Sequence, residues 1–145
     1  MANDHKDYSG TPLPKKLGIR DGSRVLLVNA PDGFEQLLTP MPDDAQLVKR
    51  PAKGLDVAVL FATEQADLIR WFDALVASID TAGRLWVAWP KKASKVDTDI
   101  DFGFAQGIGR DAGLVDNKSA SITDVFHGLQ FVYRLKDRQQ DRPQR

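Results

Sequence analysis

Residues 83–95 read Gly83-Arg84-Leu85-Trp86-Val87-Ala88-Trp89-Pro90-Lys91-Lys92-Ala93-Ser94-Lys95, an apolar run followed by a basic loop. The run from 85 to 89 is short, continuous and rich in aromatic residues, which predicts a strand covered on both faces, as in parallel sheets. Pro90 has no amide hydrogen for a ladder bond, so we expect the strand to end there. Open α/β sheets bind ligands beyond the carboxyl ends of their strands.

The basic loop is therefore a candidate contact for an anion or a phosphate. A solvated lysine loop is the alternative interpretation, and Trp89 is either core packing or part of the site. The candidate residues of this loop are Trp89, Lys91, Lys92, Ser94 and Lys95.

Two earlier apolar runs predict further buried strands, over residues 24–29 and 55–61. Thr63 is predicted to cap the helix that follows the second run, because a threonine side chain there can accept an amide hydrogen bond. Gly83 is expected just beyond the end of that helix. Strand, helix and strand in this order form a βαβ unit with a right-handed crossover.

The second half of the chain predicts one helix and two strands. Thr98 is expected to cap a helix over 99–112, although its three glycines each cost about 1 kcal/mol relative to alanine. Either this helix packs unusually close to the sheet, or it is a weak helix. Strands are predicted over 114–122 and 129–135, and the alternation in the second indicates an antiparallel strand.

The turn after the first strand is a second candidate site. It reads Asn29-Ala30-Pro31-Asp32-Gly33, with one glycine instead of the three of a dinucleotide-binding turn. The residues 107–112 match that glycine pattern, but they end a predicted helix instead of opening one, so the match is rejected. Candidate ligand residues at this edge of the sheet are Asn29, Asp32, Gly33 and Thr63; a plain strand-to-helix turn is the alternative.

Composition excludes several classes of function. The chain has 145 residues, 42% of them hydrophobic, a formal net charge of zero, no cysteine and two distant histidines. Disulfides, thiolate sites and a cysteine nucleophile are thereby excluded, and a histidine-based metal site or triad is not expected. No apolar run approaches the ~18 residues of a membrane helix, and the polar start is no signal peptide, which predicts a cytoplasmic protein. The basic C-terminal residues alternate with acids and lack aromatics, which disfavours nucleic acid as a partner.

Three segments are predicted. Residues 1–16 are polar and proline-containing, and we expect a loosely held arm. Residues 17–135 carry all the predicted strands and form one α/β domain. Residues 136–145 are charged and lack apolar side chains other than a proline, so a disordered tail is expected.

Residues 8–136 resemble a family of small uncharacterised bacterial proteins, a domain of unknown function. The resemblance rests on the stretches 12–19, 29–33, 85–92, 113–118 and 128–134. Phe126 stands where the family usually has tryptophan. The resemblance implies the fold and transfers no activity.

A more distant resemblance is to class I methyltransferases in shortened form. Leu17-Gly18-Ile19 and Gly22-Ser23-Arg24-Val25 lead into the first strand as in those enzymes, and the later strands follow in their order. The resemblance implies S-adenosylmethionine as cofactor. The chain departs from the family in two places, since it lacks the glycine-rich turn and an acidic residue ending a second strand.

These observations predict a three-layer αβα sandwich, Rossmann-like, with a mainly parallel sheet. The last strand is expected to lie antiparallel beside the strand of residues 84–89. The main hypothesis is a non-catalytic module that binds a small anionic ligand or a protein partner at the carboxyl edge of the sheet. The alternatives are a reduced S-adenosylmethionine-dependent methyltransferase and a self-associating interaction protein. The sequence names no cofactor and leaves open whether the protein is an enzyme.

Overall fold

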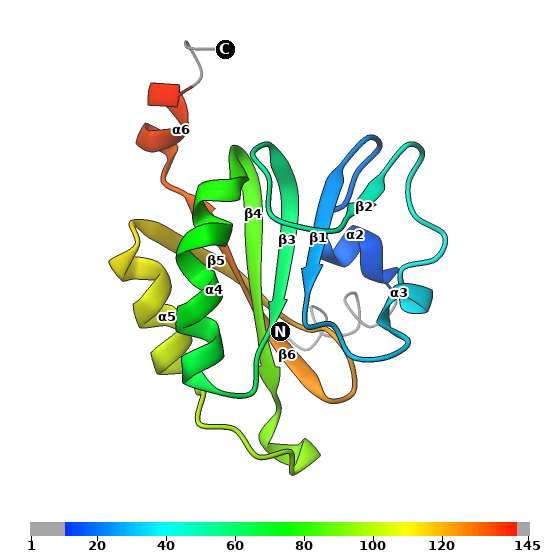
Figure 1. Ribbon diagram of the computed structural model, residues 1–145, viewed down its shortest axis with the longest axis vertical. Helices are drawn as coiled ribbons and strands as arrows, with labels where there is room; N and C mark the ends of the chain where they lie inside the picture. The colour runs from blue at the N-terminus through cyan, green and yellow to red at the C-terminus, as the bar shows by residue number, and fades with distance from the viewer. Residues whose placement is uncertain (1–10, 142–145) are drawn as a thin grey trace.

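One mixed sheet of six strands, in the order β2-β1-β3-β4-β6-β5, forms the centre of the molecule. The computed structural model describes residues 11–141 and is shown in Figure 1. Its strands are β1 (Arg24–Val28), β2 (Gln46–Val48), β3 (Leu55–Phe61), β4 (Ile79–Pro90), β5 (Leu114–Ser121) and β6 (Phe126–Tyr133). The first four are parallel to one another, whereas β6 is antiparallel to both β4 and β5. The predicted sheet, with its antiparallel last strand beside β4, is confirmed.

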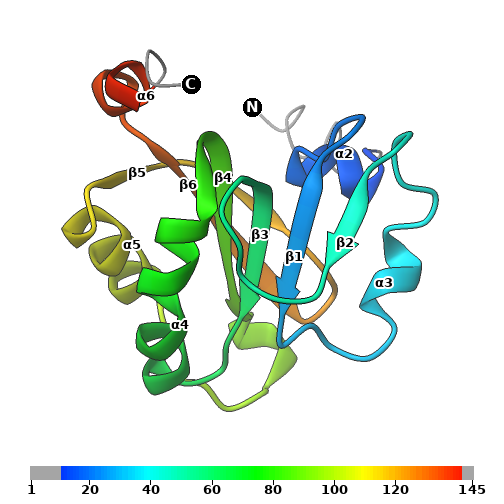
Figure 2. The ribbon, with the colours of Figure 1, turned by 45° about the horizontal axis from the view of Figure 1, so that its top comes forward.

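Helices cover both faces of this sheet. The helices α4 (Gln65–Ser78) and α5 (Phe102–Asp111) pack on one face, and the short helices α2 (Leu13–Leu17) and α3 (Phe34–Leu37) pack on the other (Figure 2). A last helix, α6 (Leu135–Asp141), follows β6. The three-layer Rossmann-like architecture predicted from the sequence is therefore confirmed.

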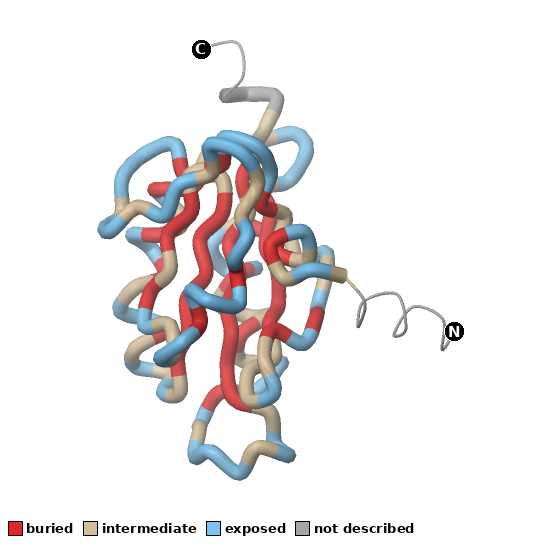
Figure 3. The backbone as a smooth tube through the Cα atoms, turned by 90° about the vertical axis from the view of Figure 1, so that its right-hand side faces the viewer, coloured by how far each residue is buried: buried red, intermediate tan, exposed pale blue. Residues whose placement is uncertain are grey.

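The central strands are buried on both faces, as their continuous apolar sequences require. Val57 and Val59 of β3 point into the core under α2 and α3, whereas Ala58 and Leu60 point into the core under α4 and α5. Figure 3 shows these strands as buried chain surrounded by exposed loops. Trp86 is fully buried, and its indole nitrogen donates a hydrogen bond to the Leu17 carbonyl at 3.0 Å, which ties α2 to the sheet.

Both predicted flexible ends contain regular structure. Residues 13–16 of the expected arm belong to α2, because prolines suit a first helical turn and Gly18 ends the helix with φ of 87°. Pro14 and Leu17 of this helix are buried. Residues 136–141, placed in the expected tail, belong to α6. Residues 1–10 and 142–145 of the two predicted segments lie outside the described residues.

Several predicted boundaries were wrong. The strand β4 begins at Ile79, directly after α4, so Gly83 lies inside a strand instead of ending the helix. The helix α5 begins at Phe102, and its N-cap is Asp101, whose carboxylate accepts a hydrogen bond from the Phe104 amide at 2.8 Å. The last strand spans 126–133 instead of 129–135. Thr98 does not cap α5 as predicted: its hydroxyl donates to the Thr63 carbonyl at 2.6 Å and accepts the Ile100 amide at 3.1 Å.

Candidate functional site

The order in which strands are added to the sheet changes side at β1, while the strands stay parallel. It passes from β1 to β2 on one side and then returns to β3 on the other side of β1. In open α/β sheets such a switch point opens a crevice beyond the carboxyl ends of the strands, where ligands bind. A pocket of about 350 Å³ lies here, and we call it the switch-point pocket. It is lined by Asn29, Phe61, Ala62, Thr63, Asp67, Arg70, Trp71 and Phe126.

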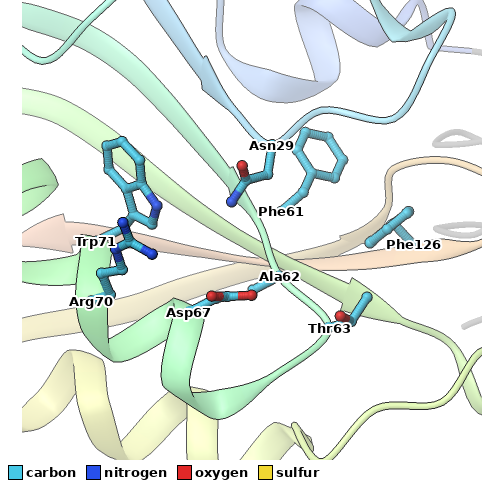
Figure 4. A pocket seen from close by; sticks show the side chains of 8 residues that line it. All are labelled: Asn29, Phe61, Ala62, Thr63, Asp67, Arg70, Trp71 and Phe126. Atoms are coloured by element: carbon cyan, nitrogen blue, oxygen red, sulfur yellow. The ribbon is translucent and has the colours of Figure 1, made fainter.

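The switch-point pocket combines flat apolar surfaces with polar side chains. Asn29 follows β1 directly in a left-handed conformation, φ 59°, which asparagine tolerates better than most residues. Figure 4 shows its amide extending across the end of β3 towards α4. Asp67, Arg70 and Trp71 lie three and four residues apart on α4, so they share one face of the helix. The pocket therefore offers an amide, a carboxylate and a guanidinium beside aromatic rings.

Two phenylalanines form the apolar wall opposite α4. The rings of Phe61, at the end of β3, and Phe126, at the start of β6, meet edge to face with centroids 5.1 Å apart. Phe61 is buried, whereas Phe126 is half-buried at the pocket.

The start of α4 is capped from a distant segment. The N-cap residue of α4 is Glu64, so the prediction that Thr63 caps the helix was wrong. The Glu64 side chain accepts no hydrogen bond from the first turn. The Gln65 amide instead donates to the Asp99 carboxylate at 2.7 Å, and the Thr98 hydroxyl donates to the Thr63 carbonyl at 2.6 Å. Because a carboxylate already faces this helix terminus, an anionic ligand gains little from its partial positive charge.

A second pocket, of about 610 Å³, lies beyond β4 at the basic loop, and we call it the lysine-loop pocket. It is lined by Trp89, Pro90, Lys91, Lys92, Thr98, Asp99, Ile100, Asp101, Phe102 and His127. Trp89 is only 6% exposed and belongs to the core, yet it also forms a wall of this pocket. Its ring meets the His127 ring edge to face, with centroids 5.4 Å apart.

Charges in the lysine-loop pocket largely offset one another. Lys91 and Lys92 line it together with Asp99 and Asp101. The Lys91 ammonium donates to the Ser121 hydroxyl at 2.6 Å, so its position is already determined by a protein partner. Burial lowers the pKa of His127 from its usual 6.5, and the nearby Lys91 charge lowers this pKa further, which keeps the imidazole neutral at pH 7. The pocket is polar without being strongly cationic.

The structure divides the nine candidate residues among three places. The switch-point pocket brings together Asn29 and Thr63. The lysine-loop pocket brings together Trp89, Lys91 and Lys92. The other four line neither pocket: Asp32 and Gly33 are exposed in the turn after Asn29, and Ser94 and Lys95 lie at the 3-10 turn η1 (Lys92–Ser94).

Ser94 has a local structural contact. Its hydroxyl donates to the Lys91 carbonyl at 2.7 Å and accepts the Val96 amide at 3.3 Å. These two bonds hold the turn of the basic loop together. The Ser94 hydroxyl therefore shapes the loop that presents the lysines.

The pocket residues that sequence reasoning missed include Asp67, Arg70, Trp71 and His127. The first three lie in the first two turns of α4, the helix that follows β3. Their spacings of three and four residues were visible in the sequence. His127 carried no such signal, because only pairing of β6 with β4 places it opposite Trp89.

Residues 11–141 lack both a clustered metal site and a membrane-spanning helix. In this range no group of three or more histidine, aspartate or glutamate side chains is arranged to hold a metal ion. No helix among the described residues has the length and apolar character needed to span a membrane.

The fold is similar to that of solved S-adenosylmethionine-dependent methyltransferases. A TehB-like SAM-dependent methyltransferase from Corynebacterium glutamicum superposes with a TM-score of 0.58 at 12% identity, covering 92% of this chain and 96% of that one. The complex of DhpI with SAH superposes with a TM-score of 0.60 at 6% identity, covering 93% and 88%.

A third similar structure is the complex of the Haloferax volcanii Trm112 methyltransferase activator with a putative methyltransferase. Its TM-score is 0.58 at 13% identity, and 91% of each chain is covered. No protein-family model matches this chain, and no curated protein matches it. At such identities the structural matches show the fold alone. The resemblance to a family of small bacterial proteins remains a prediction.

Proposed function

We propose that the protein binds S-adenosylmethionine, or a closely related adenosine compound, in the switch-point pocket and acts as a reduced class I methyltransferase. One observation carries the proposal: the pocket lies at the switch point of the sheet, in a fold shared with S-adenosylmethionine-dependent methyltransferases. Its volume of about 350 Å³ lies in the lower part of the range of small-molecule sites.

The side chains of the switch-point pocket fit the parts of such a ligand. Trp71 offers a flat surface on which an adenine ring can stack, and Asn29 offers both a donor and an acceptor to it. Asp67 is the acid available to ribose hydroxyls, and Arg70 suits a carboxylate. When bound, S-adenosylmethionine supplies an electrophilic methyl group. The protein's own contribution is to bind and orient the ligand beside the lysine-loop pocket, which would hold the acceptor.

The turn after β1 and the end of β2 depart from a dinucleotide site. The turn has Pro31, which lacks an amide donor, and only Gly33 as a glycine. Lys49 and Arg50 follow β2, where a Rossmann site has the acid that holds the ribose. We therefore assign the ribose contact to Asp67 on α4, and we expect binding in the micromolar range instead of the nanomolar range.

Isothermal titration calorimetry with S-adenosylmethionine, S-adenosylhomocysteine and adenosine tests the proposal. Loss of a base-stacking aromatic costs about 1–3 kcal/mol, so Trp71→Ala should weaken binding about tenfold or more. Ile69→Ala is the matched control, since Ile69 is exposed on another face of the same helix. The absence of binding by all three compounds, or equal affinity of Trp71→Ala and the unchanged protein, would refute the proposal.

A second candidate is the non-catalytic module, which binds a small anion at the basic loop. The exposed Lys92 and Lys95, with Lys91 beside them, favour it. A thermal-shift screen with simple phosphates, repeated on a protein with Lys91→Ala and Lys92→Ala, distinguishes the two candidates. Stabilisation that disappears in the double variant supports anion binding at the loop. Self-association, the third hypothesis, is tested by sedimentation, and a strict monomer excludes it.

A further inference from the structure

Five basic side chains form a group around Arg84 and Lys118. They come from α2, the turn after it, β4, β5 and α6, and we call them the basic cluster: Lys16, Arg20, Arg84, Lys118 and Arg138. None of them belongs to either pocket at the carboxyl edge. Arg84 precedes Pro90 by six residues, about 20 Å along an extended strand, so Arg84 lies towards the opposite edge of the sheet. The Lys16 ammonium, by contrast, reaches Ser121 at the end of β5, near the carboxyl edge.

The centre of the basic cluster is the contact of Arg84 with Gly18. The Cβ atom of any other residue at position 18 would lie 2.7 Å from the Arg84 Cδ atom and also collide with its guanidinium. Gly18 has φ of 87°, a conformation that favours glycine, and any larger residue there would also displace the Arg84 side chain. The Arg84 side chain is thus held against the end of α2 in a half-buried position.

Lys118 is held beside the same helix end. Its ammonium donates to the Lys16 carbonyl at 3.0 Å and lies 5.9 Å from the centroid of the Trp86 ring. The Lys16 ammonium donates to the Ser121 carbonyl at 3.1 Å. These contacts use backbone and ring partners and bring no negative charge to the basic cluster.

The charges of the basic cluster repel one another. Burial lowers the pKa of Arg84, and the charges of Arg20 and Arg138 lower this pKa further. Burial also lowers the pKa of Lys118, with further lowering by Arg84 and Lys16. For Arg84, burial and the two arginines are the causes found among the described residues, and all of them lower its pKa.

Arg84 has five N–H donors and uses none of them within the described part of the chain. No hydrogen bond or ion pair of its guanidinium is found there, and the ion pair that is found joins Arg110 to Asp116. The nearby acid Asp21 accepts the Asp43 amide at 3.2 Å instead. A half-buried guanidinium without an acceptor is costly, and an anion would supply both the acceptors and the opposite charge.

We propose that the basic cluster binds a phosphate group, with Arg84 as its central ligand and Arg20 and Arg138 beside it. Guanidinium groups bind phosphate oxygens through two parallel hydrogen bonds, which a lysine ammonium cannot do. The site is independent of the switch-point pocket, so each can fail without the other. A small phosphate and a phosphodiester backbone offer the same chemistry, and two probes separate them.

The first probe is inorganic pyrophosphate, titrated calorimetrically into the full chain at low salt. The second is a single-stranded RNA oligonucleotide, followed by fluorescence anisotropy. We expect Arg84→Gln and Arg20→Gln each to weaken binding about tenfold or more, since each removes a charged hydrogen-bond donor. Lys53→Gln removes one exposed positive charge elsewhere and should leave the affinity unchanged. Binding should also weaken as salt is raised.

Thermal melting without ligand separates a binding role of Arg84 from a packing role. If Arg84 is a ligand contact, Arg84→Gln should melt at the same temperature as the unchanged protein or higher, because like-charge repulsion is relieved. Arg20 is exposed, so Arg20→Gln tests the site even if position 84 does not tolerate substitution. Binding of RNA alone, lost in these variants, identifies a phosphodiester backbone; binding of pyrophosphate, lost in them, identifies a small phosphate. No binding of either probe, or binding that both variants retain, overturns the proposal.

Discussion

The helix α5 provides a test of packing in which two glycines should respond with opposite signs. Gly109 is buried against β6, and a Cβ atom there would lie 2.6 Å from the Phe131 Cζ atom and closer still to two other ring carbons. Gly107, two residues earlier, has open space around the same position, with no atom within 4 Å. The glycine-containing helix is therefore packed close to the sheet at Gly109 and not at Gly107.

The magnitudes follow from two opposing contributions. Replacing glycine by alanine inside a helix stabilises it by about 1 kcal/mol, and this gain is common to both sites. Carbon atoms pack about 3.5–4.0 Å apart, so at position 109 the ring or the helix must move by about 1 Å. Phe131 is 0% exposed and meets Phe72 edge to face at 6.1 Å, which leaves its ring little room. Overpacking of this kind costs about 1–3 kcal/mol.

We expect Gly107→Ala to raise the free energy of unfolding by about 1 kcal/mol. The free energy of unfolding of the Gly109→Ala protein should be about 1–3 kcal/mol lower than that of the Gly107→Ala protein. The difference between the two variants isolates the clash, because the helix-propensity gain cancels. Urea unfolding followed by circular dichroism measures it, and melting temperatures should differ by about 2–4 °C per kcal/mol. Equal stability of the two variants, or a more stable Gly109→Ala protein, would refute the close packing of α5.

For three further changes, the direction of the effect on stability follows from a single contact or a single titrating group. Asp99→Ala removes the acceptor of the Gln65 amide at the start of α4 and should cost about 1 kcal/mol in urea unfolding. The pKa of His127 is lowered below 6.5 by burial and by Lys91, so the unfolded chain binds more protons, and stability should fall as the pH drops below about 6.5. His127→Asn should reduce this loss in melts at pH 7.5 and 5.5. Trp86→Phe leaves a carbonyl of α2 without its donor and should cost about 1–3 kcal/mol.

Each of these predictions has an outcome that contradicts it. Asp97→Ala, at an exposed acid of the same loop, should change nothing, and an equal loss in both variants would exclude capping by Asp99. An unchanged pH dependence in His127→Asn would show that other groups cause it. Unaltered stability of Trp86→Phe would mean that the indole hydrogen bond adds nothing to folding.

The apolar runs of the sequence were sufficient to predict the sheet. The runs 25–28, 55–61 and 85–89 lack polar residues on either face, apart from Asp56, and such segments are stable only as strands covered on both sides. Parallel pairing of β1, β3 and β4 follows, because the helix between the last two returns the chain to the same edge. The antiparallel β6 was predictable from its alternating pattern.

The edge of the sheet that carries the two pockets was predictable in position, but the charge around its pockets was not. Asn29, Thr63 and the basic loop were placed correctly at the carboxyl ends of strands, because parallel strands bring those ends together. The charge of the pocket at the basic loop was predicted to be positive, but Asp99 and Asp101 line it together with Lys91 and Lys92. These acids come to face the lysines only when α5 packs on the sheet. A linear sequence shows the charge of a loop but not the charges that fold against it.

Local patterns therefore determined the strands, their order along the chain and the edge that carries the pockets. A continuous apolar run must be buried on both faces, and such a run is visible in consecutive residues. Only the tertiary structure decided which groups meet across long separations. Asp99 caps a helix 34 residues earlier, and Arg84 lies against Gly18 beside other basic side chains. Such contacts depend on the packing of whole layers, and no short stretch of sequence specifies them.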